Sequence, residues 1–219
     1  MIAWIRAVRA DRNRWPRPIN SVIDWIADHP MSVPGRLASR RYGSPTPGTP
    51  ASKIPGTTRR LLIAPVNYSS QGRAWSAAVR DHLGISAVNM AIEVPGGFAF
   101  PADLLVPQAT YQNDRDWQQR QFEAVASQAT HMLIEAQEPP FGRLLGRDVE
   151  RQAAALRDRG VDVAFIAHGT DVRLPSRHLH RTSWSHYRAP GVYVPRLEHV
   201  AATNALLLRR SGRPVFVST

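Results

Sequence analysis

Short apolar runs alternate with amphipathic stretches from about residue 59 to the end of the chain. Runs of almost continuous apolar residues predict buried strands at 59–66, 85–94, 104–107, 131–136, 161–169 and 214–219. Apolar residues three and four positions apart predict helices at 75–84, 117–129, 141–160 and 197–212. Because helices separate strands that are apolar on both faces, the pattern predicts an α/β fold, a parallel sheet with helices on both faces.

Each predicted helix has an apolar face. Asp114 or Asp116 is expected to cap the helix at 117–129, and Gly160 stands where the helix at 141–160 should end. The side chains expected to face the core are Trp75, Ala78, Val79 and His82 or Leu83 in the first helix, Phe122, Val125, Ala126 and Ala129 in the second, Leu145, Val149, Ala153 and Leu156 in the third, and Leu197, Val200, Ala201, Asn204 and Leu208 in the fourth.

Residues 1–58 differ in composition from the predicted domain at 59–219. Residues 32–60 are dense in Pro, Gly, Ser and Thr, which predicts a linker or a partly disordered arm. Before them, apolar spacing within 19–28 predicts one short amphipathic helix that Pro30 ends. This helix is expected to dock on its own domain, and the alternative is contact with an anionic membrane surface or a partner.

The positive charge is concentrated in this arm. The chain has a net charge of +11, and residues 1–60 contain eleven basic and three acidic side chains. The arm contains no recognised nucleic-acid-reading motif, so we do not expect specific nucleic-acid binding. The chain contains no cysteine, which excludes disulfides, thiol nucleophiles and thiolate metal sites. Without a secretory signal or an apolar run of about 18 residues, a soluble cytoplasmic protein is expected.

Loops that follow the predicted strands contain the candidate chemistry, because ligands of open parallel sheets bind at the carboxyl ends of strands. In the first of these loops, Gln71 and Gly72 precede a helix, and their amides could cradle an oxyanion or a sugar hydroxyl. The alternative is a plain turn capped by Ser69 or Ser70. Neither a dinucleotide-binding fingerprint nor a phosphate-binding loop motif is present.

Two further strands end in titratable residues. Glu135 could bind a substrate hydroxyl or act as a base, whereas Glu138 is expected to interact favourably with the next helix's dipole. His168 ends the strand at 161–169 and titrates near neutrality, so it suits contact with a substrate hydroxyl.

The residues after His168 extend this candidate site. Gly169 permits close approach, Asp171 could orient an imidazole or bind a sugar hydroxyl, and Arg173 could pair with Asp171 or a phosphate. The alternative is a local turn that Asp171 caps and Arg173 neutralises. Three nearby histidines give weak support for zinc, and no metal site is expected: His178, His180 and His186.

Three stretches resemble the N-terminal half of GT-B glycosyltransferases: "LLIAPVNYSSQGRAW", "HMLIEA" and "VDVAFIAHGTDVR". In this retaining, nucleotide-sugar-dependent group, two Rossmann-like domains face each other across a cleft. The resemblance covers about 61–219 and implies that Gln71 and Gly72 approach donor phosphates or acceptor, and that His168 lies near the transferred sugar. It implies no cofactor beyond the nucleotide-sugar substrate.

The chain departs from that family in two respects. Its first loop has one glycine where many members have two, and the second, donor-binding domain is missing. The sequence therefore predicts an acceptor-side domain, truncated or split, that transfers a sugar to an unknown acceptor only when a second domain completes it. In this interpretation His168 and Asp171 are catalytic, and the residues that bind substrate or phosphate are Gln71, Gly72, Glu135, Gly169 and Arg173.

Two other classes of function remain open. One is a non-catalytic Rossmann-like interaction module whose basic arm binds an acidic partner, a membrane surface or nucleic acid. The other, which has weaker support, is a stand-alone hydrolase that uses Glu135 or Asp171. The absence of a G-x-S-x-G motif argues against a serine hydrolase.

Overall fold

The computed structural model describes residues 12–98 and 100–218, which form a parallel six-stranded sheet. The strands lie in the order β3-β2-β1-β4-β5-β6, so the order reverses between β1 and β4. This confirms the predicted α/β fold, which is Rossmann-like. The strands are β1 (Arg60–Ala64), β2 (Ser86–Glu93), β3 (Leu104–Pro107), β4 (His131–Glu135), β5 (Asp162–His168) and β6 (Val215–Ser218).

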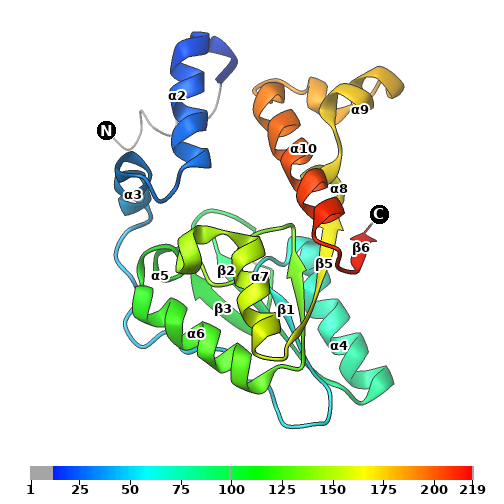
Figure 1. Ribbon diagram of the computed structural model, residues 1–219. Helices are drawn as coiled ribbons and strands as arrows, with labels where there is room; N and C mark the ends of the chain where they lie inside the picture. The colour runs from blue at the N-terminus through cyan, green and yellow to red at the C-terminus, as the bar shows by residue number, and fades with distance from the viewer. Residues whose placement is uncertain (1–11, 99, 219) are drawn as a thin grey trace.

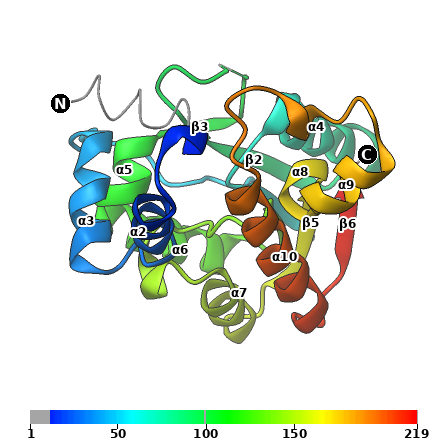
Figure 2. The same ribbon diagram turned by 90° about the horizontal axis from the view of Figure 1, so that it is seen from above.

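Helices lie on both faces of the sheet, as Figures 1 and 2 show. On one face lies α4 (Gln71–Leu83); on the other lie α6 (Arg115–Gln128), α7 (Val149–Asp158) and α10 (Val194–Arg210). No described helix is long and apolar enough to cross a bilayer. The remaining helices are α2 (Arg17–Asp28), α3 (Val33–Ser39), α5 (Gln108–Asn113), α8 (Gly169–Val172) and α9 (Pro175–Arg181), with 3-10 turns at Arg12–Arg14, Arg40–Tyr42, Tyr68–Ser70, Leu144–Arg147 and His186–Arg188.

The main core lies between the sheet and helices α6, α7 and α10. Alternate strand residues such as Leu62, Met132 and Phe165 are at most 1 % exposed and face these helices. The buried residues of α6 and α7 confirm the stripes predicted for these helices from Phe122 to Ala129 and from Val149 to Leu156. The stripes predicted for α4 and α10 are partly wrong, because Ala78, Leu83 and Leu197 are exposed, and in α10 the buried core residue is Leu207.

The opposite face of the sheet is less completely covered. Of the described helices, α4 packs on this face over β1 and β2, and an apolar groove of 860 Å³ extends beside it over β4, β5 and β6. The expectation that the last strand is buried is wrong. β6 is an edge strand, and its Phe216 and Val217 side chains are 56 % and 64 % exposed.

The N-terminal region contains more structure than its composition indicates. The predicted helix is α2, and α3 follows it. Beyond α3, an extended segment runs along α6, whose side chains hydrogen-bond its backbone: Ser52 N–H donates to Gln121 Oε1 at 2.7 Å, and Ile54 N–H donates to Gln128 Oε1 at 2.9 Å. Ile54 is buried in the core. Long-range partners therefore order a segment that composition favours as a linker.

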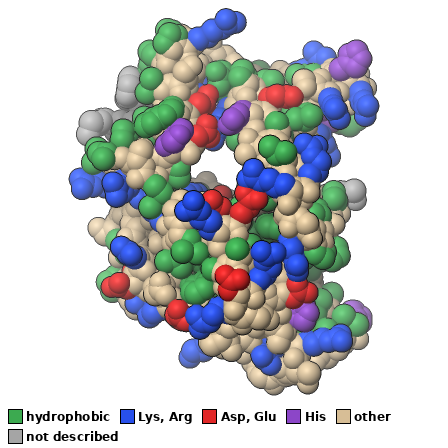
Figure 3. Space-filling view, viewed as in Figure 1, with side chains coloured by type: hydrophobic (Ala, Val, Ile, Leu, Met, Phe, Trp, Pro, Cys, Tyr) green, Lys and Arg blue, Asp and Glu red, His purple; other side chains and the backbone are tan. Residues whose placement is uncertain are grey.

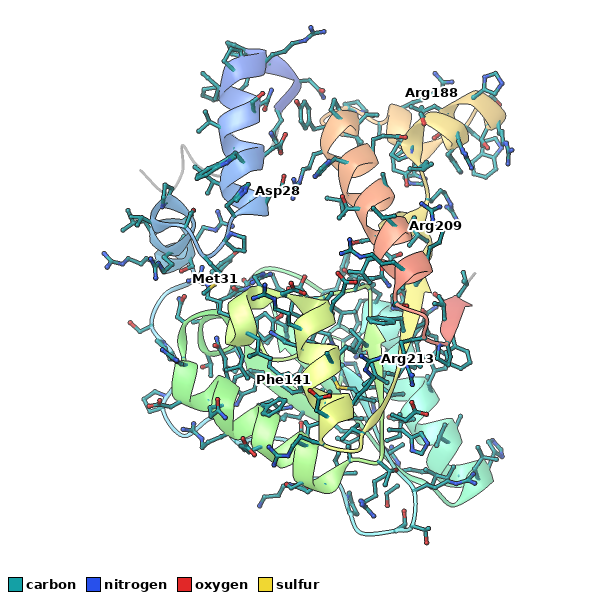
Figure 4. All side chains as sticks on the ribbon, in the orientation of Figure 1. Asp28, Met31, Phe141, Arg188, Arg209 and Arg213 are labelled. Carbon is teal, nitrogen blue, oxygen red and sulfur yellow. The ribbon has the colours of Figure 1, made fainter. Side chains whose placement is uncertain are left out.

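Helices α2 and α10 both lie above the carboxyl edge of the sheet (Figure 1), and side-chain contacts connect them. Asp28 at the end of α2 faces α10 and forms an ion pair with Arg196, and His199 Nε2 lies 3.5 Å from Asp28 Oδ2 (Figure 4). Arg12 pairs with Asp24 at 2.8 Å and stacks over the Tyr193 ring. We call this set of contacts the α2–α10 bridge. Figure 3 shows a hollow between the bridge and the sheet domain.

The predicted helix at 141–160 begins later than expected. Residues 141–147 form a loop in which Leu145 is 43 % exposed, so its expected core position is wrong. Asp148 begins α7 because its Oδ1 accepts hydrogen bonds from the Glu150 and Arg151 amides at 2.9 and 3.1 Å. Gly160 follows the helix with a φ of +81°, as predicted.

Asp148→Ala is expected to lower the free energy of unfolding by about 1 kcal/mol, because two amides of the first helical turn lose their acceptor. Urea unfolding measures the change. Asp158→Ala, at the end of the same helix, is the control and should change stability by less than half as much. Equal losses in the two variants would show that the cap contributes nothing specific.

Candidate functional site

A crevice of 820 Å³ opens at the carboxyl edge of the sheet, beside the point where strand order reverses. The segments that follow β1, β2 and β4 and the end of β3 converge on it. Such crevices are the usual ligand sites of open α/β sheets. The aromatic residues that line it are Tyr42, Tyr68, Phe98 and Phe100, and the polar ones are Asn67, Glu93, Gln108, Gln112, Glu138 and Arg147.

Glu138 and Arg147 form an ion pair in the wall of the crevice. Arg147 NH2 lies 2.6 Å from Glu138 Oε1, and the Tyr111 hydroxyl donates to the same oxygen at 3.0 Å. Burial and the neighbouring Glu138 raise the pKa of Tyr111 well above its ordinary value, so the phenol remains a donor. Glu138 therefore interacts with these two side chains, in a different place from the helix start at which it was expected.

Glu135 lies behind the crevice with no exposed surface. Its Oε1 is 3.7 Å from His168 Nε2, and neither carboxylate oxygen has a hydrogen-bond partner that meets geometric criteria among the described residues. Burial raises the pKa of Glu135 from 4.5 to about 7, and this rise is partly opposed by His168 and the Val66 amide. The carboxyl group therefore changes protonation state near neutral pH.

Gly72 has no side chain, and this leaves room for the carboxylate of Glu135. A Cβ at this position would lie 2.6 Å from Asn89 Nδ2 and 2.9 Å from Glu135 Oε1. Close packing of two buried side chains, rather than an open cradle, therefore surrounds this glycine. The Arg73 amide donates a hydrogen bond to Asn67 Oδ1 at 3.1 Å. Asn67, and not Ser69 or Ser70, therefore caps the start of α4.

His168 is 6 % exposed and is held between aromatic rings. The Trp75 ring is stacked on it with centroids 5.9 Å apart, and the Tyr68 ring meets it edge-on at 5.1 Å. His168 Nδ1 shares a 3.0 Å hydrogen bond with Ser218 Oγ, and Nε2, which faces Glu135, has no hydrogen-bond partner. Tyr68 also lines the crevice, so this residue connects the crevice with the imidazole.

The residues that follow His168 form the turn that positions it. Asp171 Oδ2 accepts a hydrogen bond from the His168 amide at 3.0 Å, and burial raises the pKa of Asp171. The bare side of Gly169 faces the Arg173 guanidinium, 2.9 Å from where a Cβ would stand. Asp171 thus caps this turn, as the structural alternative predicted. Gln71 lies elsewhere and lines the apolar groove beside α4.

The structure thus brings three of the seven predicted site residues into one buried cluster: Gly72, Glu135 and His168. Sequence reasoning missed Tyr68, Trp75 and Asn89. Asn89 was recognisable as a polar residue inside an apolar run. The two aromatic side chains gave no comparable signal because aromatic residues near helix starts usually pack in a core.

The histidines after β5 are held by local contacts. His178 Nδ1 lies 2.7 Å from Ser185 Oγ, and the rings of His178 and His186 are 5.2 Å apart. Across the residues that the structure describes, no group of three or more His, Cys, Asp or Glu side chains is placed to hold a metal ion.

Comparison of the chain with protein-family models, with curated proteins and with solved structures found no match. The fold and the geometry of the crevice are therefore the basis for a functional proposal.

Proposed function

We propose that this chain is the acceptor-side domain of a nucleotide-sugar-dependent glycosyltransferase and transfers a sugar only when a second domain or partner completes the donor site. The observation that carries the proposal is the buried pair Glu135 and His168 beside the crevice, with Tyr68 both lining the crevice and in contact with the His168 ring. Buried titratable groups that lack partners are costly and are concentrated at functional sites.

The lining of the crevice supports a polyhydroxylated ligand. Carboxylates, amides and one guanidinium offer both acceptors and donors, while the rings of Tyr68, Phe98 and Phe100 offer flat apolar surface. A sugar presents hydroxyl groups at its rim and C–H groups on its faces, so it can use both. The volume of 820 Å³ is in the range of small-molecule sites.

In this proposal, Tyr68 moves aside when the ligand binds. Ser69 and Ser70, which follow it, both have left-handed backbone conformations, with φ values of 52° and 63°. Such strain in non-glycine residues is typical of segments that hold or switch a ligand site. A displaced Tyr68 ring opens a path from the crevice to His168 Nε2 and the unpartnered oxygens of Glu135.

The chemical step would form a bond between an acceptor oxygen and the anomeric carbon and break the bond from that carbon to the donor phosphate. The acceptor hydroxyl loses a proton in this exchange. Glu135, with a pKa of about 7, can take up the proton near neutral pH, and its Oε1 lies 3.7 Å from His168 Nε2. Asp171 and Gly169 then position His168 through the turn after β5.

The test is thermal unfolding with a panel of nucleotide-sugars, free nucleotides and simple glycosides. A ligand at about 100 times its Kd should stabilise the chain by about 2.7 kcal/mol, or raise Tm by about 5–10 °C. His168→Asn should abolish most of the rise, because asparagine can replace the bond to Ser218 but not Nε2. His131→Asn, at the opposite edge of the sheet, is the control and should behave as wild type.

An unchanged rise in His168→Asn would remove His168 from the ligand site and contradict the proposal. A cooperatively folded protein that responds to no member of the panel would instead favour the non-catalytic interaction module.

A further inference from the structure

A second cavity, of 740 Å³, lies between helix α3, the turn at 40–42 and the loop at 141–147. Four of its lining side chains are arginines, and no aspartate or glutamate lines it. We call it the arginine cavity, after Arg36, Arg40, Arg115 and Arg143. It is distinct from the crevice, although Gln112 lines both.

The positive charge of the arginine cavity is not balanced within the described protein. None of its four arginines forms an ion pair with another described residue. Arg147 on the same loop is different, because it pairs with Glu138. The sequence thus places a compensating carboxylate beside one arginine of this loop and none beside Arg143.

Arg143 is the strongest indication of a ligand. Its Nε is buried without a hydrogen-bond partner, and its NH2 makes one 3.3 Å bond to the Gly35 carbonyl. Burial lowers the pKa of Arg143, and the positive charges of Arg147 and Arg36 lower it further. A guanidinium in these surroundings is destabilised unless an anion approaches it.

We propose that the arginine cavity binds a phosphate-bearing ligand. A guanidinium presents its donors in a planar fork that matches two phosphate oxygens, and Arg143 Nε is an unused donor of this kind. Ser39, Ser44 and Asn113 supply further polar groups around the same space. Binding at this site requires no sugar transfer, so its test can succeed or fail whatever the outcome for the proposed function.

The rim of the arginine cavity indicates that the ligand also has an apolar part. Met31 (labelled in Figure 4) and Leu145 line the cavity and are 37 % and 43 % exposed. The shared chemistry is a phosphate attached to an apolar or partly apolar body. A soluble phosphate ester and a phospholipid headgroup at a bilayer surface both have this chemistry.

The experiment measures binding in two arms with the full chain. In one arm, calorimetry and thermal unfolding use inorganic pyrophosphate; in the other, flotation uses vesicles of phosphatidylcholine with and without phosphatidylglycerol. Arg143→Gln should weaken binding at least ~10-fold in whichever arm wild type binds, because a charge-assisted donor pair is lost. Binding of pyrophosphate identifies a soluble ligand, and binding of anionic vesicles alone identifies a headgroup.

Arg177→Gln is the matched control. This arginine on α9 is exposed and makes no ion pair with a described residue. Its substitution therefore removes the same charge as Arg143→Gln, but at a position outside the cavity lining. Wild-type binding in Arg177→Gln, together with loss in Arg143→Gln, supports the proposal. Equal losses in both variants would indicate non-specific attraction to a basic surface and overturn it, as would the absence of binding in both arms.

The Tm of the unliganded protein distinguishes a ligand-binding role of Arg143 from a purely structural one. Arg143→Gln removes one long hydrogen bond and relieves repulsion from Arg147 and Arg36, so the unliganded protein should unfold at the wild-type Tm or above it. Arg36→Gln, on the exposed side of α3, provides a second variant that should also weaken binding. A loss of binding in Arg143→Gln that accompanies a lowered Tm, with Arg36→Gln binding normally, would overturn the proposal.

Discussion

Glu135→Gln is expected to raise the free energy of unfolding at pH 8 by about 3 kcal/mol. The native pKa of Glu135 is about 7, whereas an accessible glutamate has a pKa of 4.5. The native state therefore binds this proton more tightly than the unfolded state. Its contribution to stability is complete below pH 4.5 and is lost as pH rises through 7, where a buried carboxylate must become charged. Glutamine has nearly the same shape and never becomes charged.

The prediction is measured by urea unfolding of wild type and Glu135→Gln at pH 4 and pH 8. The difference in stability should be large at pH 8 and small at pH 4. Glu123→Gln, which changes an exposed glutamate paired with Arg159, is the control and should show less than about 1 kcal/mol at either pH. A stability difference that is the same at both pH values would show that the carboxyl group does not titrate as expected.

Gly142→Ala is expected to lower the free energy of unfolding by about 3 kcal/mol. Gly142 has a φ of +53°, and a Cβ there would lie 2.1 Å from the Tyr111 carbonyl oxygen and 2.8 Å from Gln118 Nε2. Because the first of these atoms belongs to the backbone, the loop can accept a methyl group only by moving away from α5. That movement would also displace Arg143 and Arg147, which line the two cavities.

Gly146→Ala separates the two causes of this loss. Gly146 has a φ of +79°, but nothing lies within 4 Å of the position of its Cβ. It should therefore show the backbone strain alone, about 1 kcal/mol. Denaturant unfolding of both variants measures the difference. Equal losses would mean that the close approach to Tyr111 is relieved at no cost.

All six strands of the described sheet were predictable because each is a short apolar run bounded by helical stretches or by turn residues. The apolar run at β6 also predicted a buried strand, and this prediction is wrong. An apolar run shows that a segment favours a strand, but not whether another strand or helix covers it, and Phe216 and Val217 are exposed at an edge. The short helices α5, α8 and α9 were missed because four to seven residues give too little periodicity to recognise.

The candidate site was predictable to the level of its loops. His168 and Glu135 end neighbouring strands, so the sequence places them at one edge of the sheet. Their orientation depends on Trp75 and Tyr68, whose contacts with His168 span about a hundred residues of chain. The arginine cavity was not predictable, because it requires Arg143 to meet the Gly35 carbonyl 108 positions away.

The contacts of the α2–α10 bridge between the two segments join residues that are 168 to 181 positions apart in the sequence. Contacts of such high order close a long loop and are expected to form after the sheet has provided a platform for both helices. Because the bridge is built largely from ion pairs at the surface, it should open at high ionic strength while the sheet stays intact. Raising the salt concentration should therefore release α2 from α10 above the carboxyl edge of the sheet, while the sheet itself stays folded.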